Sequence, residues 1–353
     1  MSELRLTRRK ALMSAAAVAV AACTPGASTA SPAASAGGSA AASAKAVVPF
    51  NWLFGFTVQA NPSMPVIIAK EHGYYDKEAV KISWDFTTDS TSIRLIGTNQ
   101  YQAGSVSDVL TVANFVQQGI PLVAMCQQGQ NTARVFAVKK GSPIKRPKDF
   151  EGKKVGIKPG APWTEYLAML AFDKVDRSKI TEVPVGFSSV EMKDGLVDVL
   201  PVFIGNEPFV LANQLNTPVD IIYPKDFGAP MVGTTMVANK DYIKNNRDAM
   251  IRFMKATMKA QEDFIANKAD TVQIAVQYGG TATTRAQHEY IYDVSAPDMQ
   301  DPGGVGTIHK DKWQQNLDIL VNLGLLKAAP KVDDLVDDSI MKEILSGGKV
   351  IYP

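Results

Sequence analysis

Residues 148–156 read Lys-Asp-Phe-Glu-Gly-Lys-Lys-Val-Gly and begin a strand-to-helix unit. A charged turn at Gly152 leads into a short apolar run at 154–157, which predicts a strand. Pro162 then begins a segment that ends near Asp173 and predicts a helix, because proline suits the first helical turn. Short apolar runs and amphipathic segments alternate on both sides of this unit, so the sequence predicts an α/β protein.

The same patterns place the other expected elements. Further strands are expected at 48–56, 80–86, 122–125, 135–139, 182–185, 199–203, 219–223 and 235–238. Further helices are expected at 65–72, 109–118 and 247–267, and one near the end carries an apolar stripe of Trp313, Leu317, Leu320 and Val321. The carboxy-terminal third should therefore be mostly helical.

The first 22 residues have the pattern of a secretory signal. Arg5, Arg8, Arg9 and Lys10 precede an uncharged run at 11–22, which at ~1.5 Å per residue is too short for a ~30 Å bilayer core. The run ends Val-Ala-Ala-Cys and resembles a bacterial lipoprotein box, which predicts lipidation of Cys23. The alternative is a chance cysteine in an Ala-rich signal. Residues 7–12 also resemble a twin-arginine signal, so the export route stays open.

Residues 24–44 contain only Ala, Ser, Gly, Pro and Thr. Such a segment buries too little apolar surface to offset its ordering entropy, so we expect 23–46 to be a lipidated flexible tether. Together with the signal, this predicts a protein that is exported and lipid-anchored to the outer face of the bacterial cell membrane.

Composition excludes several classes of function. The 353 residues carry 37 Lys and Arg against 35 Asp and Glu, and removing 1–22 changes the net charge from +2 to −1. The absence of a strong basic field argues against nucleic acid as a partner. Two cysteines and three scattered histidines exclude a disulfide framework and make a metal site improbable. No catalytic triad or phosphate-binding loop pattern is present, so we predict a protein without a cofactor that is not an enzyme.

Six motifs in order carry a resemblance to a known family. They are Ile-Ala-Lys-Glu-His-Gly-Tyr-Tyr at 68–75, Gln-Ala-Gly-Ser-Val-Ser-Asp at 102–108, Gln-Gly-Ile-Pro-Leu-Val at 118–123, the segment 148–156, Gly-Leu-Val-Asp-Val at 195–199 and Asn-Glu-Pro at 206–208. Over roughly 50–240 the chain resembles the solute-binding proteins of ABC importers, in the branch similar to thiamine-pyrimidine synthase that also contains sulfonate, nitrate and vitamin-precursor binders.

The resemblance implies a type II periplasmic-binding-protein fold, with two α/β lobes, two crossovers and a ligand cleft in the hinge. Carried onto this chain, lobe one would comprise 47–138 plus 235–353, and lobe two 139–234. It also implies a monomer that binds a small molecule and closes on it, which the ABC permease in the membrane would sense.

Ligands of such sheets bind at the carboxyl ends of strands, so aromatic and polar residues there are candidates. Trp52 and Phe56 share one face of the first strand, and their alternative role is core packing. Ser105 and Ser107 precede the helix expected from Val109, where the alternative is an N-cap.

The candidates in lobe two lie at two expected helix starts. Trp163 and Thr164 follow Gly160-Ala161-Pro162, where Trp163 would stack on a flat ring or pack against its own lobe. Asn206 and Glu207 begin the second helix, where Glu207 would accept N–H groups of a heterocycle or serve as a capping acid. Tyr223 at a strand end is a further candidate.

These candidates predict the ligand class. A sulfonate or nitrate pocket favours arginine, and none of the candidates is one. Aromatic walls with a few polar groups fit a flat heteroaromatic ligand, so we expect riboflavin first, then a thiamine pyrimidine precursor, then an alkanesulfonate or nitrate. The family also implies a pyrimidine-synthase-like enzyme as an alternative, which the lack of a cysteine cluster disfavours.

Overall fold

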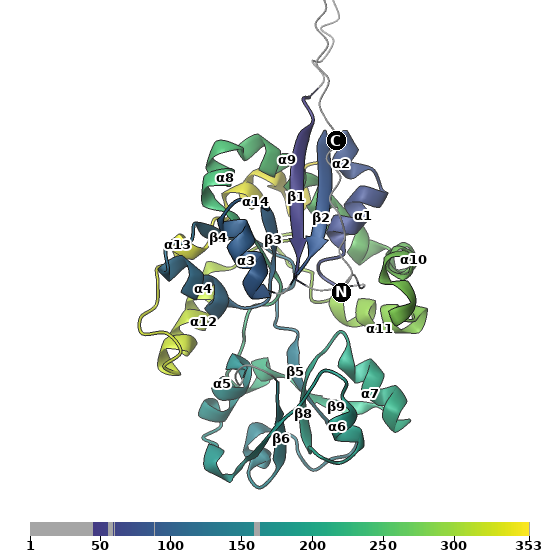
Figure 1. Cartoon of the computed structure of the whole chain (residues 1–353), viewed down its shortest axis with the longest axis vertical. Helices are drawn as coiled ribbons and strands as arrows, with labels where there is room; N and C mark the ends of the chain where they lie inside the picture. The colour runs from purple at the N-terminus through teal and green to yellow at the C-terminus, as the bar shows by residue number, and fades with distance from the viewer. Residues whose placement is uncertain (1–44, 56–58, 60, 88, 159–162, 353) are drawn as a thin grey trace, which may run out of the picture. The chain divides into compact units, whose positions relative to one another are not determined.

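The computed structural model of the protein describes residues 45–352, except 56–58, 60, 88 and 159–162. Cys23, Phe56 and the segment 160–162 therefore lie outside the described residues. The described chain contains two five-stranded sheets, each covered by helices (Figure 1). Each sheet with its helices is called a lobe below.

The sheet of lobe one has the strand order β2-β1-β3-β10-β4. Its strands are β1 (Val48–Phe54), β2 (Val80–Phe86), β3 (Ala103–Val106), β4 (Leu122–Gln127) and β10 (Thr235–Asn239). Strands β2 and β3 both run parallel to β1, whereas β10 is antiparallel to its neighbours β3 and β4. Strand β10 follows lobe two in the chain and lies between β3 and the edge strand β4.

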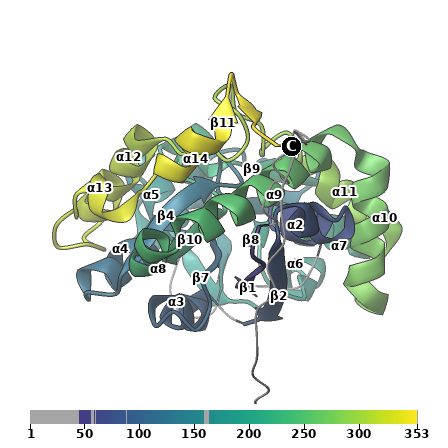
Figure 2. The ribbon, with the colours of Figure 1, turned by 90° about the horizontal axis from the view of Figure 1, so that it is seen from above.

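Helices cover both faces of this sheet. One apolar core lies between β1 and the helices α1 (Pro65–Glu71) and α9 (Arg247–Ala266), and the other includes α3 (Asp89–Gly97), α4 (Val109–Gln117) and α12 (Lys310–Asn322). The remaining helices of lobe one are α2 (Tyr74–Lys77), α8 (Lys240–Asn245), α10 (Lys268–Gly279), α11 (Arg285–Ser295), α13 (Val332–Leu335) and α14 (Ser339–Ile344). Seen from above, α10 and α11 lie at one end of the lobe and α12 and α13 at the other (Figure 2).

The sheet of lobe two has the strand order β7-β6-β8-β5-β9. Its strands are β5 (Arg134–Lys139), β6 (Lys154–Ile157), β7 (Thr181–Pro184), β8 (Val199–Phe203) and β9 (Val219–Ile222). The helices α5 (Thr164–Phe172), α6 (Val190–Lys193) and α7 (Glu207–Leu215) accompany it, with one apolar core on each face.

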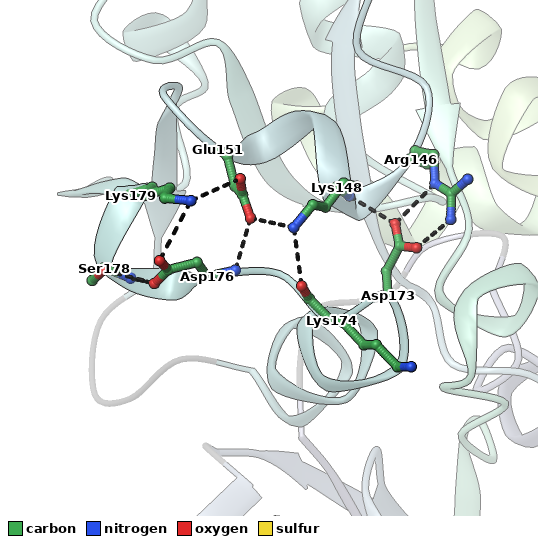
Figure 3. Close-up of polar contacts among 8 residues, drawn as sticks. All are labelled: Arg146, Lys148, Glu151, Asp173, Lys174, Asp176, Ser178 and Lys179. Carbon is green, nitrogen blue, oxygen red and sulfur yellow. Dashed lines mark hydrogen bonds and ion pairs between the residues drawn. The ribbon is translucent and has the colours of Figure 1, made fainter.

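A network of ion pairs joins the turn before β6 to the turn after α5 (Figure 3). Asp173 binds the Arg146 guanidinium, which holds the pKa of that carboxyl below its usual range, and it also accepts the Lys148 backbone N–H at 2.7 Å. Glu151 accepts from the Lys148 ammonium at 2.6 Å. Because its basic side chains are about half exposed, the network is expected to fix the local geometry more than to stabilise the lobe.

Two crossovers connect the lobes, one between β4 and β5 and the other between β9 and β10. They are hydrogen-bonded to each other, since the Thr132 N–H donates to Met231 O at 2.9 Å and the Gln128 N–H to Thr234 O at 2.8 Å. Two α/β lobes with two crossovers confirm the expected fold class. The expected first boundary is corrected, because β5 pairs with β8 and β9 and so belongs to lobe two from Arg134, not from residue 139.

Each strand expected from the sequence is present, with ends shifted by three residues or fewer. Strand β3 was not expected, because Ala-Gly-Ser-Val has too little apolar bulk to show strand alternation. Gly104 is required there, since a Cβ at this position would lie 2.7 Å from Leu53 O of the paired strand. Helix α3 was also not expected. Among the described residues, no helix has the length and apolar character needed to cross a membrane.

Candidate ligand-binding site

A cavity of about 740 Å³ lies where the two lobes face each other. Lobe one contributes Gln59, Pro62, Ser107 and the segment after α11, and lobe two contributes the ends of β8 and β9. Residues 131–133 of the first crossover form its inner side. The volume lies within the ~300–1,000 Å³ typical of small-molecule sites, and the position at strand ends is the one expected for this class of sheet.

Two aromatic side chains form the wall of the cavity in lobe two. Phe203 ends β8 and its ring packs at 5.3 Å from the ring of Trp163. Tyr223 follows β9, is 40% exposed and has the Lys225 ammonium 5.7 Å from its ring centre. Rings that stay accessible at a cavity wall can stack on a flat ligand.

Lobe one contributes a carboxylate to the cavity. Asp298 accepts the Asn131 side-chain amide at 2.7 Å and the Asn131 backbone N–H at 3.1 Å. Burial raises the pKa of this carboxyl above its usual range, although the Asn131 hydrogen bonds and the nearby Lys225 charge act the other way. Asp293, the other acidic residue at the cavity, is 58% exposed and is paired with Lys268 at 2.6 Å.

Three of the predicted site residues meet at this cavity. Ser107 lies just before the Asp108 N-cap of α4, and Asp108 accepts the Thr111 N–H at 2.6 Å. Asn206 lies before α7 and accepts the Gln287 amide at 2.9 Å, and Tyr223 follows β9. Asp108 therefore makes the capping bond, which leaves Ser107 at the cavity wall.

The structure corrects the predictions for Trp52 and Ser105, which lie in lobe one but do not line the cavity. Trp52 is fully buried and stacks on Phe253 of α9 at 5.7 Å, so the core-packing alternative holds. Ser105 is 1% exposed and contacts Ser63 Oγ at 3.3 Å and Gln128 Oε1 at 3.2 Å. Both side chains face the layer between the sheet and its helices.

Glu207 is also buried away from the cavity. It pairs with Lys158 at 3.1 Å, with both side chains 2% exposed or less, and its other oxygen accepts the Phe203 N–H at 2.9 Å. Lys158 further donates to Gly186 O at 2.7 Å. Glu207 therefore holds the backbone of the cavity-lining Phe203 and is not itself at the cavity wall.

Trp163 and Thr164 lie beside the cavity, not in it. Trp163 packs against lobe two, 6.2 Å from the ring of Phe136 and 5.6 Å from the Arg134 guanidinium. Thr164 lines a separate small space beside Asp108 and Arg134, whose side chains form an ion pair between the lobes at 3.3 Å. The alternative reading of Trp163, packing on its own lobe, is the one that the structure supports.

The sequence predictions did not include Phe203, Lys225, Asn131 or Asp298. Phe203 could have been predicted from the sequence, because it ends an expected strand at the edge of the sheet where ligands bind. No sequence pattern predicts that Asn131 and Asp298 meet at the cavity, because they are 167 positions apart and come together only through folding.

Comparison with known proteins supports this fold. A family model described as NMT1/THI5 like matches residues 61–271, more than half of the chain. The riboflavin-binding protein RibY of Chloroflexus aurantiacus is 23% identical over 300 residues, which cover 80% of this chain and 82% of that protein.

Two solved structures show the range of proteins with this architecture. The aliphatic sulphonate binding protein SsuA from Escherichia coli superposes with a TM-score of 0.63 at 17% identity, covering 82% of this chain and 92% of that one. The desulfurization enzyme DszB superposes with a TM-score of 0.58 at 11% identity, covering 83% and 98%. These likenesses confirm the binding-protein fold, and the matching family model shows that the chain belongs to the NMT1/THI5-like family.

Proposed function

We propose that the chain is the solute-binding protein of an ABC importer, and that its ligand binds in the cavity between the lobes. The cavity has the size of a small-molecule site and is lined by both lobes, so a bound molecule would hold them together. The permease would recognise that liganded form. The family match and the fold support this role.

The ligand proposed is a flat heteroaromatic vitamin or precursor, with riboflavin first and a thiamine pyrimidine precursor second. The observation that carries this proposal is the wall of Phe203 and Tyr223 in a cavity whose described lining includes no arginine. Rings favour a flat partner, whereas a planar oxyanion would favour a guanidinium. The riboflavin-binding relative points the same way.

An alkanesulfonate or nitrate ranks third. The sulphonate-binding neighbour has the same fold, but a likeness at 17% identity does not indicate that the two proteins bind the same ligand. Lys225 is the basic side chain among the described lining residues, and it is exposed at the cavity. A single exposed ammonium is a weak site for an oxyanion, because it is hydrated and lacks the bidentate geometry of arginine.

Catalysis is the alternative to ligand binding as the function of this chain, since one structural neighbour is a desulfurization enzyme. The histidines and Cys126 are the groups to consider, and none of them is among the described residues that line the cavity. Cys126 is fully buried, and burial raises its pKa, so its thiol is a poor nucleophile. Binding without turnover is the function that these positions support.

Export and lipidation at Cys23 complete the proposal. The signal at 1–22 would be removed, and the lipid on Cys23 would hold the protein at the outer face of the cell membrane, beside the permease. Cys23→Ala should shift the protein from the membrane fraction to the soluble fraction, and mass spectrometry should show the loss of the diacylglyceryl and acyl groups. Unchanged fractionation and mass would contradict lipidation.

The ligand is tested by titrating the purified chain with riboflavin and following the flavin fluorescence. Stacking on Phe203 and Tyr223 should quench the fluorescence saturably at one flavin per protein. The thiamine pyrimidine, hexanesulfonate and nitrate are tested by the shift in melting temperature that each produces. Stabilisation by hexanesulfonate or nitrate, with no effect of riboflavin or the pyrimidine, would overturn the proposed ligand class.

A further inference from the structure

We propose that Asp298 determines ligand specificity by accepting a hydrogen bond from a ring N–H of the ligand and by repelling oxyanions. This inference rests on the proposed function and deepens it. The ligand class that it names is a flat heterocycle with a donor N–H at its edge, such as the imide of a flavin. Ligands with an anionic group at that edge would be excluded.

The carboxylate is held in a fixed orientation. Asn131 lies in the first crossover and donates its side-chain amide to Asp298 Oδ1 at 2.7 Å and its backbone N–H to the same oxygen at 3.1 Å. The Asp298 backbone carbonyl accepts the Gln130 N–H at 2.9 Å, so the main chain is held as well. A fixed acceptor loses little entropy when a ligand donor reaches it.

The second carboxylate oxygen keeps capacity for a ligand. Among the described residues, Asp298 Oδ2 accepts the Asn131 N–H at 3.4 Å, which is long for a hydrogen bond of this type. An ionised carboxylate accepts about four hydrogen bonds, and Asp298 lines the cavity. A ligand N–H at this oxygen would form a charge-assisted bond, which is about twice as strong as a neutral one.

Three other polar side chains at the cavity are already engaged by protein partners. Thr132 Oγ1 donates to Glu165 at 2.8 Å, and Asn206 Oδ1 already accepts from Gln287 at 2.9 Å. Asp293 is exposed and neutralised by Lys268, so water and its partner weaken its field. Of these groups, Asp298 is therefore the acceptor best able to bind a ligand N–H.

Charge supports the exclusion of oxyanions. The Asp298 side chain is partly buried at the cavity, and charges interact more strongly where water is partly excluded. The positive charge of Lys225 favours the ionised form of Asp298, which is the form that repels an anionic ligand. A sulfonate in the cavity would meet that repulsion.

The test compares riboflavin with 3-methylriboflavin, in which a methyl group replaces the imide hydrogen, on the purified wild-type chain and on Asp298→Asn. The wild type should bind riboflavin roughly 10- to 100-fold more tightly than the methylated form, the range for a hydrogen bond to a charged group. Asp298→Asn should weaken riboflavin binding by about 10-fold and reduce the discrimination by at least 5-fold. Any steric penalty of the methyl group is common to both proteins and cancels.

Asp333→Asn is the matched control, because it removes an exposed carboxylate that is paired with Lys310 and does not line the cavity. Its affinity for both flavins should stay within about 2-fold of the wild type.

Equal discrimination by the wild type and Asp298→Asn would overturn the inference and leave the proposed function intact. If Asp298→Asn does not fold, the wild-type affinities for the two flavins provide the test. Equal wild-type affinity for riboflavin and 3-methylriboflavin would also overturn the inference. Failure of the wild type to bind riboflavin would instead count against the proposed ligand.

Discussion

The Lys158–Glu207 pair shows how a charged residue can act at this site without touching a ligand. Lys158 follows β6 and Glu207 begins α7, and their side chains are 1% and 2% exposed. Between them they bind Gly186 O and the Phe203 N–H. The pair therefore ties three segments of lobe two together directly behind the aromatic wall of the cavity.

Removing one member of this pair should be costly. Lys158→Met leaves the Glu207 carboxylate buried without its counter-charge, and we expect a loss of about 3–5 kcal/mol in the free energy of unfolding, measured by urea denaturation. The double variant Lys158→Met, Glu207→Gln should recover a large part of that loss. Lys342→Met is the control, because it breaks a pair with Asp338 in which Lys342 is 72% exposed, and it should cost less than about 1 kcal/mol. Equal losses for the two lysine variants would contradict this account.

Single residues also show where sequence reasoning reaches its limit. Strand alternation correctly places Trp52 and Phe54 on one face of β1. Both faces of this sheet are covered by helices, however, so alternation cannot tell which face meets a cavity. Ser107 and Asn206 were predictable because they lie at expected helix starts, and Tyr223 because it ends an expected strand. Asp298 was not, because it lies after a helix and depends on tertiary contacts.

At the scale of elements, α11 connects lobe one to lobe two beside the cavity. Gln287 donates to Asn206 at 2.9 Å, and the Tyr290 hydroxyl donates to Ile204 O at 2.9 Å. The ring of Tyr290 also lies 5.7 Å from that of Phe209 on α7. Figure 1 shows α11 at the edge of lobe one that faces α7. These contacts must break when the lobes separate, so they favour the closed arrangement.

Tyr290→Phe should therefore make opening easier. It removes one hydrogen bond between the lobes, worth about 0.5–1.5 kcal/mol, so the ratio of open to closed molecules without ligand should rise about 2- to 10-fold. Spin labels at the exposed positions Lys81 and Lys193, one in each lobe, would report the distance distribution. Tyr292→Phe is the matched control on the same helix, because its hydroxyl donates to Ile265 O within lobe one. An identical distance distribution for Tyr290→Phe and the wild type would contradict the role of α11.

The same helix should make stability depend on pH. The His288 side chain is fully buried and contacts Thr283 Oγ1 at 2.8 Å, and burial followed by the Arg285 charge lowers its pKa. Because the folded-state pKa lies below the unfolded value of about 6.5, the unfolded chain binds the proton more tightly. Its contribution to stability should be complete above about pH 6.5 and lost progressively below it.

Melting temperatures of the wild type and His288→Gln between pH 7.5 and 5 would check this expectation. Other groups titrate in both proteins, so the quantity of interest is the difference between the two curves. That difference should shrink as the pH falls, because only the wild type carries the buried imidazole. A difference that stays constant over the whole range would show that His288 does not titrate with unfolding.

For the molecule as a whole, the crossovers and α12 hold the two lobes together. Leu317 and Leu320 of α12 lie in a core of lobe one, while Ile319 packs against a core of lobe two. Asn316 on the same helix accepts the Val232 N–H at 2.9 Å and donates to Pro230 O at 3.1 Å. Closure must therefore take place by small backbone changes in the two crossovers, which are hydrogen-bonded to each other, and of which the second is also bonded to α12.

The two-lobed architecture was predictable from the sequence, whereas this hinge was not. Alternating strand and helix patterns, together with six ordered motifs, are enough to indicate two α/β lobes. The first crossover was placed too late, because β5 is an apolar run whose sequence does not say which sheet it joins. Such pairing is decided by contacts between residues far apart in the chain, as between β5 and β8.

Gly233 is the position where this hinge should tolerate least change. A Cβ there would lie 2.2 Å from Asn131 O and 2.6 Å from Gly129 O, so the two crossovers approach each other too closely for any side chain. We expect Gly233→Ala to lower the free energy of unfolding by about 1–3 kcal/mol, because the crossovers must move apart. It should also weaken ligand binding, since Asn131, which orients Asp298, lies in the first crossover, which would be displaced.

Gly186→Ala is the matched control, because its Cβ would have only ordinary contacts, the nearest at 3.5 Å from Glu191 Oε1. This change should alter the free energy of unfolding by less than about 1 kcal/mol. Urea denaturation gives the stability of both variants, and riboflavin titration gives their affinity. The close approach of the crossovers matters to function only if Gly233→Ala lowers both quantities relative to Gly186→Ala. A Gly233→Ala protein that binds as tightly as the wild type would show that the hinge can relax around a side chain without disturbing the cavity.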